Sequence, residues 1–378
     1  MSLFSTHPWA RWAVPTTAVA LIGGGVVVAT QAASADPSLP TRTPAQLLVD
    51  VQQARLSAIS GTVVQTSNLG LPDLPGIGGG GGLGGGSSSL TSMVSGTHTW
   101  RLWYAGPQQA RVALLGNLGE SDVIRNGKDL WVWSSADKKA THTRLPAHAN
   151  AATHEQPSPT ELPKTPQEAA DLALKALGPT TSVTTSGAAV VAGRSAYELV
   201  LAPKDHASLV GQVRISLDAA RHIPLRVQVF STKAANPAFE VGFTSVDFAK
   251  PDASRFMFNP PPGTTVSESS AKPEAPSATQ KQGVADATKG VHVVGTGWTS
   301  VVVATLPKDT AGSTAGGAKG RPAGSLQRML SALPKVSGAW GSGRLLKGTL
   351  FSVVVTDDGR VAVGAVTPDR LYAALAAK

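Results

Sequence analysis

Three histidines recur at intervals of six residues, at positions 142, 148 and 154. Imidazole nitrogens grouped in this way bind transition metals when further ligands complete the coordination shell. Two of the three lie in the segment Ala147–Pro163, whose Pro and Ala content is typical of an irregular connection. The spacing alone therefore does not define a metal site, and we expect no metal and no cofactor.

Two other groups contain residue types used in catalysis. Asp357-Asp358 is the only adjacent pair of carboxylates, but Asp-Asp-Gly-Arg is also ordinary chemistry for a hairpin turn. Asp205-His206 precedes Ser208, yet no third group that would orient the histidine is recognisable. The chain also lacks Gly-x-Ser-x-Gly, His-Glu-x-x-His and cysteine. We therefore predict a protein without catalytic residues.

Aromatic residues on two predicted strands are more informative. Trp131 and Trp133 are two positions apart, so both side chains point to one side of a strand, and the same holds for Trp100, Leu102 and Tyr104. Such a concentration of large apolar side chains fits a packed core, a ligand surface or a partner surface. The residues alone favour a sheet that packs over helices, with a ligand pocket as the alternative.

Three segments begin with Thr-Pro and predict helices. Thr at the N-cap followed by Pro is a good helix start, and Gln or Glu three residues after the Thr completes a capping box. This pattern occurs at Thr43, with Gln46, and at Thr165, with Glu168, while Thr367 begins a third segment. The apolar side of the first helix, which must be buried, is formed by Leu47, Leu48, Val51, Ala54 and Ala58.

Most of the remaining sequence predicts strands joined by short turns. Consecutive strands with short links imply an antiparallel meander, which forms a barrel or a strongly curved sheet when helices are few. A further hairpin near the C-terminus has Asp358-Gly359 at its turn. The strands expected before it are 61–66, 97–105, 109–115, 121–125, 128–134, 139–144, 181–186, 188–192, 195–202, 210–218, 224–231 and 239–248.

The ends and linkers divide the chain into parts. Residues 1–35 have the pattern of an export signal, with an apolar run before the triplet Ala33-Ser34-Ala35. An uncleaved membrane anchor is the alternative, and either one places the rest of the chain outside the cytoplasm, secreted or held at the cell envelope. We expect a domain over 36–266 that contains a Gly-rich loop, a linker over 267–290 and a small α+β domain over 291–378.

The distribution of charge argues against one class of partner. The formal net charge is +9 at pH 7, but the Lys and Arg residues are scattered rather than clustered with interleaved aromatic residues. We therefore expect no nucleic acid. A weak attraction to an anionic membrane or wall surface is compatible with this charge, and so is peripheral membrane association; anchored association would come from an uncleaved N-terminal anchor.

Several of the predicted strands carry a pattern that is known from other proteins. It consists of "WRLWYAGPQQARVALL" at 100–115, "DVIRNGKDLWVWSSADKKATHTRLP" at 122–146, "VAGRSAYELVLAPKD" at 191–205 and "FMFNPPPGTTV" at 256–266. Together these stretches resemble the LolA/RseB-like superfamily of exported bacterial proteins, over about residues 40–266. The Gly-rich stretch at 71–89 departs from that pattern, and the C-terminal unit matches no part of it.

The resemblance implies an α+β fold, an open antiparallel half-barrel of about 10–11 strands wrapped around two helices. In this superfamily the space between sheet and helices takes lipid or lipoprotein acyl chains, and RseB-like members also bind a membrane-anchored anti-sigma factor. We therefore expect a non-enzymatic binder of acyl chains that acts as a carrier or envelope sensor, with a regulatory interaction protein as the alternative. The residues expected to line the cavity are Trp100, Leu102, Tyr104, Trp131, Trp133, Leu47, Leu48 and Val51.

Overall fold

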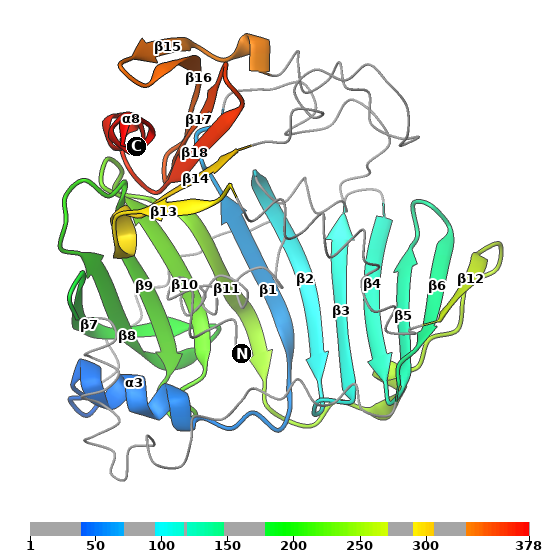
Figure 1. Ribbon diagram of the computed structural model, residues 1–378. Helices are drawn as coiled ribbons and strands as arrows, with labels where there is room; N and C mark the ends of the chain where they lie inside the picture. The colour runs from blue at the N-terminus through cyan, green and yellow to red at the C-terminus, as the bar shows by residue number, and fades with distance from the viewer. Residues whose placement is uncertain are drawn as a thin grey trace.

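Two β-sheets form the described part of the protein. The computed structural model describes residues 39–71, 95–116, 119–146, 178–270, 290–305 and 330–377. The predicted export signal, most of the Gly-rich loop and the predicted helix that begins at Thr165 lie outside these ranges. One sheet has twelve strands and the other has six, and the smaller sheet lies against one end of the larger (Figure 1).

The large sheet consists of two meanders joined in the middle by β1 and β11. The order of its strands is β12-β6-β5-β4-β3-β2-β1-β11-β10-β9-β8-β7, and among these the β12–β6 pair is parallel while the others are antiparallel. The strands are β1 (Ile59–Ser67), β2 (Gly96–Tyr104), β3 (Gln109–Gly116), β4 (Gly119–Asn126), β5 (Asp129–Ser134), β6 (Lys139–Arg144), β7 (Thr181–Val191), β8 (Arg194–Pro203), β9 (Val210–Asp218), β10 (Pro224–Ser231), β11 (Pro237–Asp247) and β12 (Thr265–Ser270).

The strands predicted from the sequence are confirmed, with small shifts at their ends and two differences. The stretches 181–186 and 188–192 form one strand, β7, with an irregularity between Thr185 and Ala188. The prediction of a linker from residue 267 is wrong for its first residues, because 267–270 continue β12 along the edge of β6. This pairing joins segments far apart in the chain, so no local sequence pattern predicts it.

Helix α3 (Pro44–Gln53) confirms the first Thr-Pro prediction. The Thr43 side chain accepts a hydrogen bond from the Gln46 backbone N–H, and the Gln46 side chain accepts one from the Thr43 backbone N–H. The helix ends at Gln53, so Ala54 is its C-cap and Ala58 lies beyond it. The apolar side of the helix is therefore shorter than predicted.

The side chains of α3 pack onto strands at one end of the large sheet. Leu47 is fully buried against β8 and β9, while Leu48 and Val51 are half-buried beside it. The buried strand residues in this cluster are Tyr197, Leu199 and Leu217. A large, mostly antiparallel sheet with few helices is thus confirmed. The second of the two predicted helices that such a sheet would surround falls outside the described residues.

The smaller sheet has its own core. Its strands are ordered β13-β14-β18-β17-β16-β15, all antiparallel, and helix α8 (Pro368–Ala376) covers it. The predicted hairpin is confirmed as β17 and β18 with the turn at Asp358-Gly359, and α8 confirms the third Thr-Pro segment. The strands are β13 (His292–Val294), β14 (Val301–Thr305), β15 (Lys335–Gly338), β16 (Gly341–Lys347), β17 (Ser352–Thr356) and β18 (Arg360–Gly364).

The two sheets meet through a few polar contacts. The Leu209 N–H donates to the Ala365 carbonyl at 2.8 Å, and the Thr349 N–H donates to the Leu69 carbonyl at 2.7 Å. The Trp298 indole donates to the Thr181 hydroxyl at 2.8 Å; Trp298 lies in the short 3-10 helix η4 (Gly297–Thr299). In Figure 1 the smaller sheet lies above the strands of the large sheet, whereas α3 lies near the lower ends of β8 and β9.

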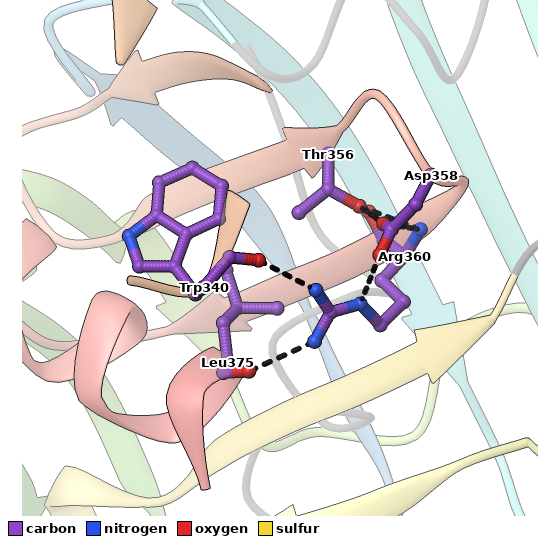
Figure 2. A network of polar contacts seen from close by, with 5 residues as sticks. All are labelled: Trp340, Thr356, Asp358, Arg360 and Leu375. Carbon is purple, nitrogen blue, oxygen red and sulfur yellow. Dashed lines mark hydrogen bonds and ion pairs between the residues drawn. The ribbon is translucent and has the colours of Figure 1, made fainter. Parts of the chain in front are cut away.

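Arg360 ties together the elements of the smaller sheet. Figure 2 shows its guanidinium between Asp358 and two backbone carbonyls, those of Trp340 and Leu375, each at 2.8 Å. Leu375 lies in the last turn of α8, where carbonyls have no partner within the helix. The Arg360 backbone N–H also donates to the Thr356 hydroxyl. One side chain therefore fixes a hairpin, a strand connection and a helix end.

Replacing Arg360 with Ala should destabilise the protein by on the order of 3 kcal/mol, because three charge-assisted hydrogen bonds are lost and two carbonyls lose their donor. Denaturant unfolding of the full chain measures the change. Arg370→Ala is the matched control, since Arg370 is exposed and reaches Asp205 at only 3.6 Å, and we expect a change below about 0.5 kcal/mol there. Equal effects of the two substitutions would contradict the role assigned to Arg360.

Candidate functional site

An apolar row crosses four neighbouring strands of the large sheet. Leu102 of β2 is opposite Val112 of β3, which is opposite Val123 of β4, which is opposite Val132 of β5. Directly opposed residues in antiparallel strands project to the same face, so the four side chains form one continuous band. Val123 and Val132 are 48% and 47% exposed, which is unusual for paired apolar residues in the middle of a sheet.

The predicted residues Trp100 and Tyr104 lie on the same face as this row. They alternate with Leu102 along β2, and Trp100 is opposite Val63 of β1. The strand register continues this face across β11, β10 and β9 to the residues of β8 that contact α3. We call it the α3 face. The structure thus places Trp100, Leu102 and Tyr104 on the face of the sheet against which α3 packs with Leu47, Leu48 and Val51; Leu47 is fully buried in the core.

Trp131 and Trp133 lie on the other face of the sheet, so the prediction that they line the same surface as Trp100 is wrong. Trp131 is opposite Ile124, which is opposite Arg111, which is opposite Trp103. Trp103 and Trp100 are separated by an odd number of positions and therefore point in opposite directions. Alternation within each strand was read correctly from the sequence, but the relation between the two strands depends on register, which only the fold sets.

The face that carries these tryptophans is covered by the protein's own chain. The 3-10 helix η3 (Ala253–Phe256) packs on β3 and β4, and Phe256 is 1% exposed. Phe258 follows it and lies 5.2 Å from the Trp131 ring and 5.9 Å from the Trp133 ring. We call this the η3 face. Trp131 and Trp133 are therefore half-buried beneath the protein's own chain.

A buried ion pair lies on the η3 face beside these aromatic rings. Arg111 donates to the carboxylate of Asp122, and its guanidinium lies over the Trp103 ring. Asp122 has no exposed surface, and its second oxygen has no hydrogen-bond partner among the described residues. Burial raises the pKa of Asp122 to about 7, against the opposing charge of Arg111. This carboxyl is therefore costly to ionise, although it faces a guanidinium.

The residues with catalytic or metal-binding potential do not assemble into a site in the described part of the chain. Asp358 is a turn residue that binds Thr356 and Arg360, and Ser208 donates to a backbone carbonyl. His148 and His154 lie outside the described residues. Within the described ranges, no group of three or more His, Asp or Glu side chains could hold a metal ion.

Two hollows in the described part of the molecule lie away from the apolar row. One, of about 380 Å³, is bordered by the β2–β3 and β4–β5 turns, and the other, of about 240 Å³, lies where the two sheets meet. Neither is lined by Leu102, Val112, Val123 or Val132. The apolar row is therefore a surface of the sheet rather than one of these hollows.

None of the described helices has the length and apolar character needed to cross a bilayer.

Sequence reasoning missed the valines of the apolar row. Val112 and Val123 each have one charged and one apolar neighbour along their strands, and Val132 lies between Trp131 and Trp133, so no strand by itself singles out its valine. Their coincidence in one row needs the register of three hairpins at once. The short turns Gly106-Pro107 and Asn126-Gly127 were the available signal, because turn length sets the pairing of the strands that it joins.

Asp122→Asn should change how stability depends on pH. The pKa of Asp122 is raised to about 7 in the folded protein from 3.8, so its contribution to stability is present below about pH 4 and is lost as the pH rises through about 7. We expect the free energy of unfolding of the native protein, relative to Asp122→Asn, to fall across this window. Denaturant unfolding at a series of pH values measures it. Asp369→Asn, at an exposed position, is the control. If the difference in the free energy of unfolding between the native protein and Asp369→Asn depends on pH as strongly as the difference for Asp122→Asn, the interpretation is refuted.

No protein-family model matches the chain, and no curated protein matches it. Several solved structures are similar to the chain. A chain of the MucA/MucB complex from Pseudomonas aeruginosa matches with 14% identity and a TM-score of 0.39, over 87% of this chain and 94% of the other. A LolA superfamily protein from Nitrosomonas europaea matches with 10% identity and a TM-score of 0.21, over 58% of this chain and 99% of the other. Identities and TM-scores this low assign neither a superfamily nor a function to this chain.

Proposed function

We propose that this protein binds the acyl chains of lipids or lipoproteins on the α3 face, outside the cytoplasm and without catalysing a reaction. One observation carries the proposal: the row Leu102, Val112, Val123 and Val132 runs unbroken across four strands, and its outer half is about half exposed. Soluble proteins rarely leave a continuous apolar band open, and such bands mark binding surfaces.

The dimensions and chemistry of the row suit a hydrocarbon chain. Four adjacent strands spaced by roughly 4.8 Å give a band roughly 14 Å long from β2 to β5. The band itself contains no charged residue, and Trp100 and Tyr104 add aromatic surface on either side of Leu102. Each methylene group removed from water contributes about 0.8 kcal/mol to the free energy of binding. The acyl chain of a membrane lipid can therefore be held without a charged anchor.

The wider architecture that we propose is a sheet that curves around α3 and the predicted helix beginning at Thr165, as an open half-barrel. The fully buried Leu47 would then be a packing residue, and Leu48 and Val51 would border the bound chain. The export signal predicted at residues 1–35 supports a location outside the cytoplasm, where lipoproteins and envelope lipids are found. The residues expected to contact the chain are Trp100, Leu102, Tyr104, Val112, Val123, Val132, Leu48 and Val51.

Val132→Lys and Val123→Lys, tested singly, should each weaken acyl-chain binding at least tenfold, because an ammonium group would have to be desolvated by the bound chain. Both positions are about half exposed, so folding should change by less than about 0.5 kcal/mol. Titration with a fluorescent fatty acid measures affinity. Val293→Lys, at a 40% exposed position on β13 of the other sheet, is the matched control.

A substitution on the η3 face should affect stability rather than binding. Trp131→Ala should lower stability by about 3 kcal/mol or more, because it removes a ring packed on Phe258, and should leave affinity unchanged in the fraction that folds. The proposal would be refuted if the native protein binds no fatty acid and carries no lipid when purified from its own host. It would be refuted equally if the Lys substitutions have no more effect than Val293→Lys.

A second candidate is a regulatory protein that binds a membrane-anchored anti-sigma factor. It is favoured by the smaller sheet, which has its own core and meets the large sheet through few contacts. Its edge strand β15 has mostly exposed residues, and no other strand of the described ranges pairs with its outer side, a geometry that accepts an added strand from a partner. We propose accordingly that residues 291–378 form a separate domain behind a linker.

Crosslinking in the native host tests this second candidate. The full chain should capture a membrane protein of the regulatory type, and a chain that ends at Ser270 should not. Capture of the same partner by both would show that the smaller sheet has no part in the interaction. Capture of neither, together with bound lipid, would leave acyl-chain binding as the function.

A further inference from the structure

The strand β12 is held at the edge of the large sheet by few contacts. It pairs in parallel with β6, and the side chains of residues 265–269 are exposed, with Val266 at 44%. Little apolar surface is therefore buried when β12 docks, so the backbone ladder and side-chain contacts must hold it. The Ser267 hydroxyl lies 3.3 Å from the Thr141 hydroxyl and donates to the Ala140 carbonyl at 3.4 Å, so it joins the two strands.

His142 supplies the strongest side-chain contact between β6 and β12. Its Nδ1 lies 2.8 Å from a carboxylate oxygen of Glu268 on β12, and its Nε2 lies 2.9 Å from a carboxylate oxygen of Asp129 on β5. The ring stacks on Trp131 at 4.3 Å between centroids. The imidazole is therefore fixed between two carboxylates by an aromatic surface beneath it.

This arrangement requires the charged form of the ring. A neutral imidazole has one N–H, so one of its two nitrogens would turn a lone pair toward a carboxylate that can only accept. The imidazolium donates from both nitrogens and bonds both carboxylates. The contact between His142 and Glu268 thus exists as a hydrogen bond, together with that to Asp129, only while the ring holds its second proton.

We propose that protonation of His142 controls whether β12 is docked on β6, so that the last strand of the large sheet is a latch released by rising pH. Release would free the edge of β6 and would add six residues, roughly 20 Å when extended, to the chain that leads toward the smaller sheet. The next described residue after Ser270 is Gly290. The latch would lengthen the chain that follows β6's edge toward the smaller sheet without altering either core.

The charges that face His142 set the direction of the effect. Burial of the ring lowers its pKa, but the hydrogen bonds and charges of Asp129 and Glu268 outweigh this and raise the pKa above the usual value. One cation, Arg144, lies on the same face two residues further along β6 and opposite Asp129. Because the pKa is raised in the docked state, docking is fully favoured at low pH and is lost as the pH rises through the docked-state pKa.

Amide hydrogen exchange of the full chain between pH 5 and pH 9 tests the latch. Protection of 265–270, corrected for intrinsic exchange and compared with β9 (Val210–Asp218), should fall with rising pH, tenfold for each pKa unit by which docking raises the His142 value. In Glu268→Gln the midpoint should move to lower pH, because one of the two carboxylates is neutral. The Glu268 side chain is 72% exposed, so this substitution leaves the core intact.

Further variants separate the latch from other titrations. His142→Gln should give a protection of β12 that does not change with pH, with β9 protection confirming that the variant is folded. Asp122→Asn and His292→Gln, which alter other groups on the η3 face and on β13, should keep the native transition. Protection of β12 that is constant across the pH range in the native protein would overturn the proposal. The same transition in His142→Gln as in the native protein would also overturn it.

Discussion

The strict alternation of side chains in strands held in one unbroken register is the constraint on which this molecule depends. From β6 to β1 each strand is paired residue for residue with its neighbour, so the direction of one side chain decides the direction of all its partners. With Trp100 on the α3 face, Trp131 is necessarily on the η3 face. A slip of one residue at any hairpin would exchange the two surfaces beyond it.

The two faces of the large sheet satisfy their apolar side chains in different ways. On the η3 face, Phe256 and Phe258 from the chain after β11 pack over the sheet and its aromatic rings, so the protein's own chain covers this part of that face. On the α3 face, helix α3 covers the strands near β8, while Val123 and Val132 at the other end remain about half exposed. This asymmetry is why binding is assigned to the α3 face and stability to the other.

The charged groups described above mainly connect different strands and helices of the fold. Arg360 holds the end of α8, the pair of Arg111 and Asp122 is buried beside the rings of the η3 face, and His142 links β5, β6 and β12. In each case a charged donor meets acceptors from separate segments, so a local change in protonation or side chain affects how segments dock. These groups regulate or stabilise the fold; none of the three lies on the apolar row.

Local chemistry was readable from the sequence because its causes are local. The Thr-Pro helix starts, the positions of most strands, the Asp358-Gly359 turn and the alternation of Trp131 with Val132 each depend on residues within a few positions of one another. The parallel addition of β12, the separation of Trp100 from Trp131 onto opposite faces and the alignment of Val112, Val123 and Val132 depend on pairings between distant segments. Periodicity says that two side chains of a strand share a face, but which face it is emerges only when all the strands are hydrogen-bonded together.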